Sequence, residues 1–460
     1  MYKYRTPLIR QGKKIAKFNL SIISRKRKLG RCFSGFGYKM QEDCYTCCMT
    51  MLQEFEIDLL TMVYGGDAMG RLPDGRAVFV PFGLPGERVR ARIIEEKKGY
   101  ARGQLIEIMR PSPLRIAARC PHFTACGGCH YQHLAYNEQL KVKEAIVREQ
   151  LTRIGELPDP PLRPIRPSPR EWNYRNAVQF HLDAGGKVGY QKANSHEVIA
   201  IRECHLPEDA LNQLWPRLEF EPESGLERLE LRLGQFEDVL LELESEEPNP
   251  PEFSVDFPIS AVYRSPAGEL VLSGVDYTQI EVLGVPFQVS AGSFFQVNTA
   301  QAAAMAQHML ELVKIDQKST VLDVYCGVGL FSSFLACQAG RVIGVEAAPS
   351  ACEDFAANLN SFDNVDLYEG TAEEILPYLD VRPDVVIVDP PRAGIERAAL
   401  DALIGMGAPA LVYVSCDPAT LARDTKRLVR AGYSLEQVTP FDLFPQTYHV
   451  ECIALFRKPG

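Results

Sequence analysis

The strongest constraint on the fold of this chain is a regular alternation of strand-like and helix-like segments after Ala300. Such alternation forms a mostly parallel sheet with helices on both faces, because each strand needs a helical crossover to reach the next. Residues 291–460 are therefore predicted to be a doubly wound α/β domain. The last two strands lack a helical crossover, which predicts an antiparallel hairpin at one sheet edge. The predicted strands are Thr320–Tyr325, Arg341–Glu346, Val365–Glu369, Asp384–Asp389, Leu411–Ser415, Leu435–Phe441 and His449–Phe456.

Residues 51–111 show a different pattern, in which short apolar stretches alternate with turns rich in glycine and proline. Four or five such strands in so short a segment predict a small β-barrel. Basic residues gather in its second half, where they either bind RNA phosphates or are solvated hairpin charges. The predicted strands are Phe55–Leu60, Ala77–Pro81, Arg88–Glu95 and Ala101–Met109, and the basic residues are Arg88, Arg90, Arg92, Lys97, Lys98 and Arg102.

Length and charge limit the remaining organisation. The 460 residues, 46% of them apolar, suffice for about three domains, the third being a β-rich central domain over residues 112–290. A net charge of −9 excludes a uniformly basic surface, so any nucleic-acid surface must be local. No stretch approaches the roughly 20 apolar residues of a membrane span. We expect a cytoplasmic monomer without membrane contact, whose cysteines are ligands or nucleophiles rather than disulfides.

Residues 1–50 form a basic head that contains twelve lysines and arginines but only two acids. The head lacks hydrophobic periodicity, which predicts disorder. Three interpretations are open: a transit peptide, an RNA-binding tail, or sequence that precedes a true start near Met51. We favour the last, because the ordered pattern begins there.

The run Leu411–Asp424 carries the most informative cysteine. Its apolar strand ends at Cys416, and a helix follows immediately, with Asp417 suited to cap it and Pro418 suited to its first position. The sulfur of Cys416 would lie at the carboxyl end of a strand, where open α/β sheets bind ligands. A lone cysteine is more often a buried core residue. Its surroundings favour a nucleophile here.

Three successive strand ends carry residues typical of a nucleotide-type cofactor site. Gly327 and Gly329 lie between a strand and a helix, Glu346 ends the next strand, and Asp389-Pro-Pro-Arg392 follows the fourth. Each alone is as easily a tight turn or a cap. Together they favour S-adenosylmethionine over a dinucleotide, because the glycines do not form a complete dinucleotide-binding fingerprint.

Several separated motifs make residues 54–460 resemble the RNA uracil-5-methyltransferase family, whose members make 5-methyluridine in ribosomal and transfer RNA. The N-terminal barrel resembles the family's TRAM domain, which binds RNA. One departure is Asp417, where the family often has Asn, and its negative charge opposes thiolate formation. The motifs are Phe294-Phe-Gln-Val-Asn298, the loop Asp323–Gly329, Asp389-Pro-Pro-Arg392, Ser415-Cys-Asp-Pro418 and His449-Val-Glu451.

The resemblance assigns roles to particular residues. It implies that Cys416 is the nucleophile and Glu451 the proton acceptor. It also implies that the methyl donor is held by Gln296, Tyr325, Glu346 and Asp389. Leu330 and Thr371 stand where relatives offer polar donor contacts, so those two contacts are not expected. Uracil C5 is a weak nucleophile, and addition of a thiolate to C6 would activate it.

A second set of cysteines lies in the central region, with Cys120, Cys126 and Cys129 close in sequence and Cys204 remote. Four thiolates bind either zinc or a [4Fe–4S] cluster, and their spacing does not choose between them. The resemblance implies a [4Fe–4S] cluster, since ribosomal RNA members carry one at this pattern. We interpret the remaining C-terminal cysteines as core residues: Cys326, Cys337, Cys352 and Cys452.

The sequence thus predicts an enzyme that methylates C5 of a uridine in 23S ribosomal RNA through a covalent intermediate. A uridine in the T-loop of transfer RNA is the nearest alternative. A non-catalytic, metal-stapled RNA-binding protein is a rival of another class, and the presence of both Cys416 and Glu451 argues against it. A redox iron–sulfur protein is a further rival, but the sequence shows no second electron-transfer site.

Overall fold

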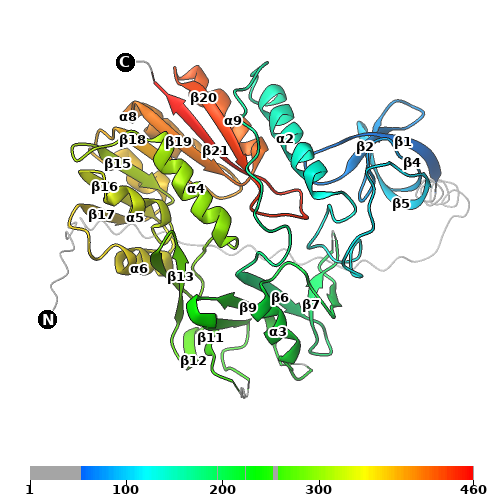
Figure 1. Cartoon of the computed structure of the whole chain (residues 1–460), viewed down its shortest axis with the longest axis horizontal. Helices are drawn as coiled ribbons and strands as arrows, with labels where there is room; N and C mark the ends of the chain where they lie inside the picture. Colours follow the sequence, from blue (N-terminus) through cyan, green and yellow to red (C-terminus); the bar gives the residue numbers. More distant parts are fainter. Residues whose placement is uncertain (1–52, 194, 223, 252–256, 459–460) are drawn as a thin grey trace, which may run out of the picture. The chain divides into compact units, whose positions relative to one another are not determined.

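The structure is a computed structural model that describes residues 53–193, 195–222, 224–251 and 257–458. The expectations for residues 1–50 lie outside these ranges. None of the helices in the described part of the chain has the length and apolar character needed to cross a membrane. Figure 1 shows the barrel, the central sheet and the C-terminal sheet with their helices.

The N-terminal strands close into the predicted barrel, with the order β1-β2-β3-β5-β4. Alternate residues point inward; Ile57, Leu59 and Val89 are among those that form its apolar core. The sequence analysis missed β2, whose Gly70 interrupts the apolar pattern. A Cβ on Gly70 would lie 2.5 Å from Ile57 Cγ2, so the strands can pair this closely only at glycine. The strands are β1 (Glu54–Met62), β2 (Ala68–Arg71), β3 (Ala77–Val80), β4 (Arg88–Glu96) and β5 (Tyr100–Arg110).

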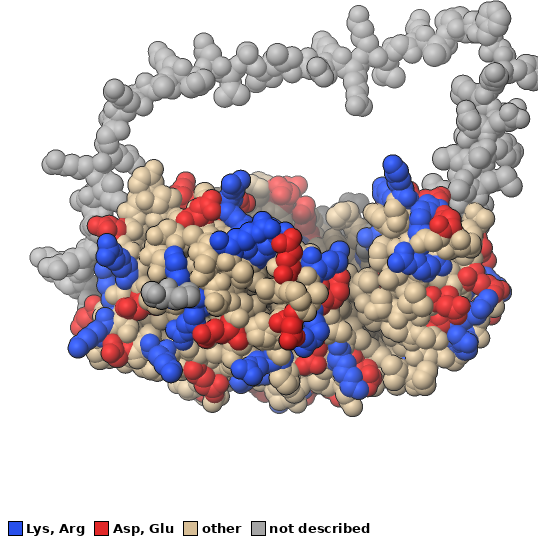
Figure 2. All heavy atoms as spheres, turned by 90° about the horizontal axis from the view of Figure 1, so that it is seen from above, with Lys and Arg blue, Asp and Glu red and all other residues tan. Residues whose placement is uncertain are grey.

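The basic residues of the barrel lie beside acids on the same barrel. Arg88 pairs with Glu56 at 2.9 Å and Arg90 with Glu107 at 2.9 Å. Arg92, Lys97 and Arg102 also have carboxylate partners within 4 Å. On the face seen in Figure 2, basic and acidic side chains are likewise interspersed. These contacts favour solvated cross-strand charges over a dedicated phosphate-binding patch.

The central region is β-rich, as predicted. Its mixed sheet of seven strands has the order β12-β11-β10-β9-β6-β7-β8, and a separate hairpin, β13-β14, follows. Helix α2 (Tyr136–Arg153) packs with Val147 and Leu151 against the C-terminal sheet. The other elements are β6 (Ala177–Leu182), β7 (Val188–Gln191), β8 (Val198–Ala200), α3 (Asp209–Leu214), η1 (Trp215–Arg217), β9 (Leu226–Leu233), η2 (Gln235–Glu237), β10 (Val239–Ser245), β11 (Ser260–Ser265), β12 (Gly268–Ser273), β13 (Tyr277–Val282) and β14 (Val285–Ser290).

The C-terminal domain is a seven-stranded sheet with the order β17-β16-β15-β18-β19-β21-β20. The first five strands are parallel neighbours, and β21 inserts antiparallel between β19 and β20. The elements are α4 (Thr299–Leu312), β15 (Thr320–Val324), α5 (Leu330–Ala336), β16 (Arg341–Glu346), α6 (Pro349–Asn358), β17 (Val365–Glu369), α7 (Ala372–Ile375), η3 (Leu376–Tyr378), β18 (Val385–Val388), α8 (Arg397–Met406), β19 (Ala410–Ser415), α9 (Pro418–Arg430), β20 (Ser434–Phe441) and β21 (Glu451–Arg457).

Two apolar clusters lie on opposite faces of this sheet. One contains residues of α2, α7, α8 and α9, and the other contains residues of α4, α5 and α6. The arrangement confirms the doubly wound prediction, including the antiparallel hairpin at the edge. Cys326, Cys352 and Cys452 are buried as expected, but the interpretation of Cys337 was wrong. It is exposed, just beyond the end of the short helix α5.

Candidate active site

Strand pairing brings the two residues proposed for chemistry together. In the β19–β21 ladder Ser415 lies opposite Cys452. Cys416 and Glu451 are the residues next to this last pair, one just after β19 and the other the first residue of β21. The charge of Glu451 acts on the Cys416 thiol, so the thiol and the carboxyl share one site. The site lies at the carboxyl end of β19, where the sheet edge is open to ligands.

The Cys416 thiol lies in an electrostatically unfavourable place for an anion. Burial raises its pKa to about 12, and the negative charges of Glu451 and Asp389 add to that rise. Arg392 opposes the rise, while Asp417 contributes to it. Cys416 is therefore a protonated thiol at neutral pH. Ionisation needs a positive charge or a proton acceptor next to the site.

Glu451 is a buried carboxyl, with 5% of its surface exposed. Burial and, to a smaller extent, the charge of Asp389 raise its pKa to about 8, while Arg392 opposes the rise. A carboxyl that titrates near neutral pH can accept and release a proton during a reaction. Arg392 Nη2 lies 3.4 Å from both ring nitrogens of His449, and burial lowers the pKa of that histidine to about 3.

The turn that follows Cys416 is fixed from two sides. Asp417 Oδ1 accepts hydrogen bonds from the backbone N–H groups of Ala419 at 2.8 Å and Thr420 at 3.0 Å, which caps α9 as predicted. Asp417 Oδ2 accepts a hydrogen bond of 2.6 Å from the hydroxyl of Tyr64, on the loop after β1 of the barrel. No local sequence pattern points to Tyr64, because its role depends on a contact between residues 353 positions apart.

Carboxylates converge at the strand ends beside Cys416. Burial raises the pKa of Asp323 to about 7 and that of Asp389 to about 7, and in both cases Glu346 adds to the rise. Asp323 Oδ2 accepts a hydrogen bond from Ser332, whereas its buried Oδ1 has no partner in the described structure. Such a cluster of like charges favours a cationic ligand, and S-adenosylmethionine carries both a sulfonium and an ammonium group.

The glycine loop leaves room for that ligand. A Cβ on Gly327, at φ +54°, would meet no atom within 4 Å, so the backbone borders open space. Gly327 N–H donates to Glu346 Oε2 at 2.9 Å, and Glu346 Oε1 accepts from Ala347 and Ala348. These bonds leave lone pairs on Glu346 for ribose hydroxyls. Tyr325 has φ +63° in the same loop.

Three other residues were considered for the methyl-donor site: Gln296, Leu330 and Thr371. Gln296 is buried, whereas Phe294 of the same motif is 69% exposed and is a residue for which no role was predicted. Leu330 is buried in an apolar cluster, and Thr371 forms a capping box with Glu374 at the start of α7.

The four central cysteines are free thiols on loops. Burial raises the pKa of Cys126 to about 11 and of Cys129 to about 12, and Cys204 adds to the rise for both and for Cys120. The four thiols therefore share one neighbourhood. Within the ranges that the structure describes, however, no group of three or more His, Cys, Asp or Glu side chains is placed to hold a metal ion.

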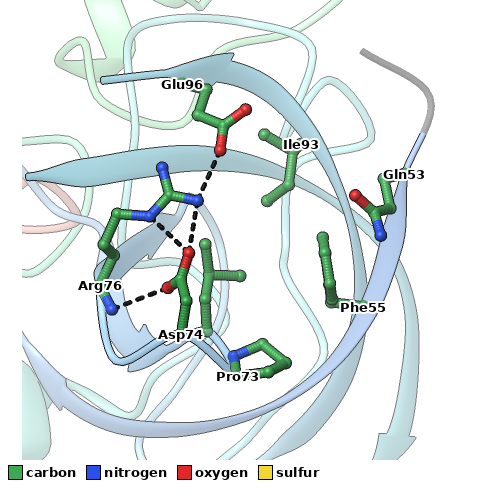
Figure 3. A pocket seen from close by; sticks show the side chains of 8 residues that line it. Gln53, Phe55, Pro73, Asp74, Arg76, Ile93 and Glu96 are labelled. Atoms are coloured by element: carbon green, nitrogen blue, oxygen red, sulfur yellow. Dashed lines mark hydrogen bonds and ion pairs between the residues drawn. The ribbon is translucent and has the colours of Figure 1, made fainter. Parts of the chain in front are cut away.

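A cleft of about 750 Å³ connects the cysteine loop with the catalytic loop. Its walls come from the barrel loop, the cysteine loop, strands β6 and β7, and the segment just before Glu451. Several of its lining residues are aromatic or basic, the two kinds of side chain that bind single-stranded RNA: Tyr64, Phe82, Arg102, Tyr190, Lys192 and Tyr448. A second pocket, of about 170 Å³, lies on the barrel, but its Arg76 is already paired with Asp74 and Glu96 (Figure 3).

Comparison with known proteins decides the family. Residues 256–459 match the tRNA (Uracil-5-)-methyltransferase model, and residues 53–106 match the TRAM domain. An uncharacterized RNA methyltransferase of Bacillus cereus is 36% identical over 424 residues, which cover 84% of this chain and 92% of that protein. One from Gloeobacter violaceus is 34% identical over 88% of this chain and 97% of that protein. The chain belongs to the RNA uracil-5-methyltransferase family.

A solved structure extends the likeness to the whole architecture. The tRNA (uracil-54, C5)-methyltransferase of Pyrococcus abyssi, in complex with S-adenosyl-L-homocysteine, is 26% identical to this methyltransferase. The two chains superpose with a TM-score of 0.69 over 87% of this chain and 100% of that one. This methyltransferase is thus an S-adenosylmethionine-dependent RNA methyltransferase with an N-terminal TRAM barrel.

Proposed function

We propose that this methyltransferase methylates C5 of a uridine in structured RNA, with Cys416 as nucleophile and Glu451 as proton acceptor. The observation that carries the proposal is the β19–β21 pairing, which ends at Ser415 and Cys452 and so brings the adjacent Cys416 and Glu451 into one site. The acidic strand ends beside this pair support a methyl-donor site formed by Gln296, Tyr325, Glu346 and Asp389.

The chemistry follows from uracil itself. The Cys416 thiolate adds to C6, which breaks the C5–C6 double bond and leaves C5 electron-rich. Bound S-adenosylmethionine supplies the electrophilic methyl group, and its positive sulfonium offsets the carboxylate charges that oppose thiolate formation. After C5 has taken the methyl group, the Glu451 carboxylate removes the C5 proton. The electrons of that C–H bond restore the C5–C6 double bond and expel the Cys416 thiolate.

The cleft beside the catalytic loop is our proposed path for the RNA strand. Aromatic side chains such as Tyr64 and Tyr448 offer faces for base stacking, whereas the basic side chains of the cleft, Lys192 and Arg102, have carboxylate partners at Glu197 and Glu95. The target base must leave its stack to reach Cys416, which costs a few kcal/mol. Exposed Phe294 is suited to replace part of that lost stacking.

Ribosomal RNA is the RNA class that we propose first, because the barrel and the four central cysteines follow the pattern of family members that act on it. Transfer RNA is the second candidate, and a specific observation favours it. The Pyrococcus abyssi enzyme, which superposes along its entire length, is a transfer RNA uracil-54 methyltransferase.

We further propose that Cys120, Cys126, Cys129 and Cys204 bind a [4Fe–4S] cluster. In such a cluster each thiolate binds a different iron atom, so the sulfurs stand farther apart than around one zinc ion. The shared neighbourhood of the four thiols supports a four-thiolate site, and the family resemblance is what favours the cluster over zinc. The role we expect is structural, because the backbone N–H groups of His130 and Tyr131 both donate to Gln446 O, on the loop that leads to Glu451.

Mapping 5-methyluridine in ribosomal and transfer RNA from a strain that lacks this enzyme tests the proposal. One uridine should lose its methyl group and regain it with the wild-type enzyme. Cys337→Ala should restore it as well, because this thiol is exposed and lies outside the site. Cys416→Ala should not restore it. Unchanged 5-methyluridine in both RNA classes would contradict the proposal, and the class that loses it decides between the candidates.

A further inference from the structure

Tyr64 is the only side chain of the barrel for which the structure gives a hydrogen bond to the residue after the nucleophile, within the described residues. Its loop contacts the catalytic region in more than one place. The Tyr64 ring meets that of Tyr448 edge-on, with centroids 5.8 Å apart. A Cβ on Gly66 would lie 3.2 Å from Tyr448 and 3.3 Å from His130, so a larger residue does not fit at this approach. The barrel loop is thus seated on the catalytic loop.

The two oxygens of the Asp417 carboxylate have different hydrogen-bond partners. Oδ1 caps α9, and Oδ2 would be left as a bare negative charge beside Cys416 if the Tyr64 hydroxyl did not donate to it. A carboxylate has no hydrogen to give, so the tyrosine must be the donor. Burial and this hydrogen bond raise the pKa of Tyr64 above its usual range, which keeps the hydroxyl protonated at working pH.

We infer that Tyr64 is a positioning residue for the nucleophile, whose hydroxyl orients the Asp417 carboxylate and disperses its charge so that Cys416 can ionise. The inference rests on the proposed role of Cys416. It gives the barrel a second task besides RNA binding, because the nucleophile is fully competent only when the barrel loop is seated. It also accounts for an aspartate at a position where its charge works against the thiolate.

The charged groups that face Cys416 come from three segments. Glu451 on β21, Asp389 after β18 and Asp417 at the start of α9 oppose ionisation of Cys416, whereas Arg392, also after β18, favours it. Arg392 and Tyr448 also act on Tyr64. Among the described residues, the charged group hydrogen-bonded to the Tyr64 hydroxyl is Asp417, so a substitution at Asp417 isolates its effect.

The test measures how fast iodoacetamide alkylates Cys416 as a function of pH, by mass spectrometry of the peptide, without RNA or methyl donor. Tyr64→Phe keeps the ring contact with Tyr448 and removes only the hydroxyl. It should slow alkylation at pH 8 by about 3- to 10-fold, as expected for a rise of up to one pKa unit. Asp417→Asn, which still caps the helix, should speed it. In the Asp417→Asn background, Tyr64→Phe should change the rate by less than about 2-fold.

Tyr100→Phe is the matched control, since it removes a barrel hydroxyl while its ring keeps the contact with Phe79. It should follow the wild-type profile. A Tyr64→Phe profile that superposes on wild type would overturn the inference. Equal slowing in both Asp417 backgrounds would also overturn it, because the effect would then be loosened packing rather than dispersed charge. Methylation by Cys416→Ala would refute the proposed function instead. The alkylation rates would still report whether Tyr64 affects ionisation of the Cys416 thiol.

Discussion

Two groups of cysteines in this methyltransferase are placed by different physical means. Cys416 is held by a hydrogen-bonded strand ladder, a capped helix and the barrel loop, so its position is complete in the polypeptide alone. Cys120, Cys126, Cys129 and Cys204 lie on loops and share a neighbourhood, but among the described residues they are not placed to hold a metal ion. Burial raises the pKa in both groups, so thiol ionisation alone does not separate them.

This contrast is expected from the two kinds of site. A nucleophile must be positioned before its substrate arrives, whereas structural cysteines can be brought into position by the metal that they bind. Substitution in the first group should therefore remove chemistry and spare the fold. Substitution in the second group should weaken the fold and leave the chemical step possible.

Cys416→Ala should reduce turnover at least about 1000-fold, since no other group can activate C5. Its free energy of unfolding should stay within about 1 kcal/mol of wild type, because the thiol is only partly buried. Single-turnover methylation and thermal unfolding measure the two effects. Cys337→Ala is the control and should change neither. A large loss of stability in Cys416→Ala would contradict the proposed difference, because substitution in either group of cysteines would then weaken the fold.

Glu451→Gln should lower turnover by about 100- to 10,000-fold while binding of RNA and donor remains unchanged. The amide cannot remove the C5 proton, so the methylated RNA should stay covalently attached to Cys416. Denaturing gels and intact-protein mass spectrometry detect this adduct. Normal turnover would show that another base acts.

Turnover should rise steeply with pH between 6 and 8. Glu451, with a pKa raised to about 8, acts as a base only when deprotonated, and Cys416, with a pKa raised to about 12, reacts only as the thiolate. Each ionisation is lost as pH falls, so turnover should drop at least about tenfold per unit below pH 8. The comparison uses kcat, which includes the final removal of the C5 proton, at constant ionic strength. A flat profile would mean that neither group titrates in the rate-limiting step.

Cys126→Ser should remove bound iron and lower the free energy of unfolding by about 2–4 kcal/mol, the range expected when a structural metal is lost. Anaerobic iron analysis and calorimetry measure both quantities. The covalent reaction at Cys416 should persist in the fraction that stays folded. Stoichiometric zinc in anaerobic wild-type protein would reject the cluster, and unchanged stability would reject its structural role.

Features that depend on local sequence patterns could be predicted, whereas features that depend on contacts between distant segments could not. The seven C-terminal strands were located from the alternation of strand-like and helix-like segments, because short apolar runs between helical segments indicate buried strands. The insertion of β21 between β19 and β20 was not foreseen, since pairing partners are set by tertiary packing. That insertion is what brings Glu451 near Cys416. Tyr64 and the cleft depend on contacts between distant segments, which no local pattern records. The domain boundaries, the residue roles and the bound cluster remain predictions.

Removal of residues 1–50 should have the smallest effect. Every family motif follows this segment, and its basic residues would add only nonspecific attraction to RNA. Methylation rates of the full-length and shortened enzymes should agree within about 2-fold at physiological salt and diverge more at low salt. A large loss at physiological salt would show that the basic head belongs to the working enzyme.

The central claim is that Cys416 adds to uracil C6 before the methyl group is transferred. RNA that carries 5-fluorouridine at the target position tests it most directly, because fluorine cannot leave C5 as a cation and the intermediate is trapped. With S-adenosylmethionine present, the account predicts a stable adduct in which Cys416 is joined to a methylated 5-fluorouridine, found by peptide mass spectrometry. An active enzyme that forms no adduct, or one joined through another residue, would contradict it.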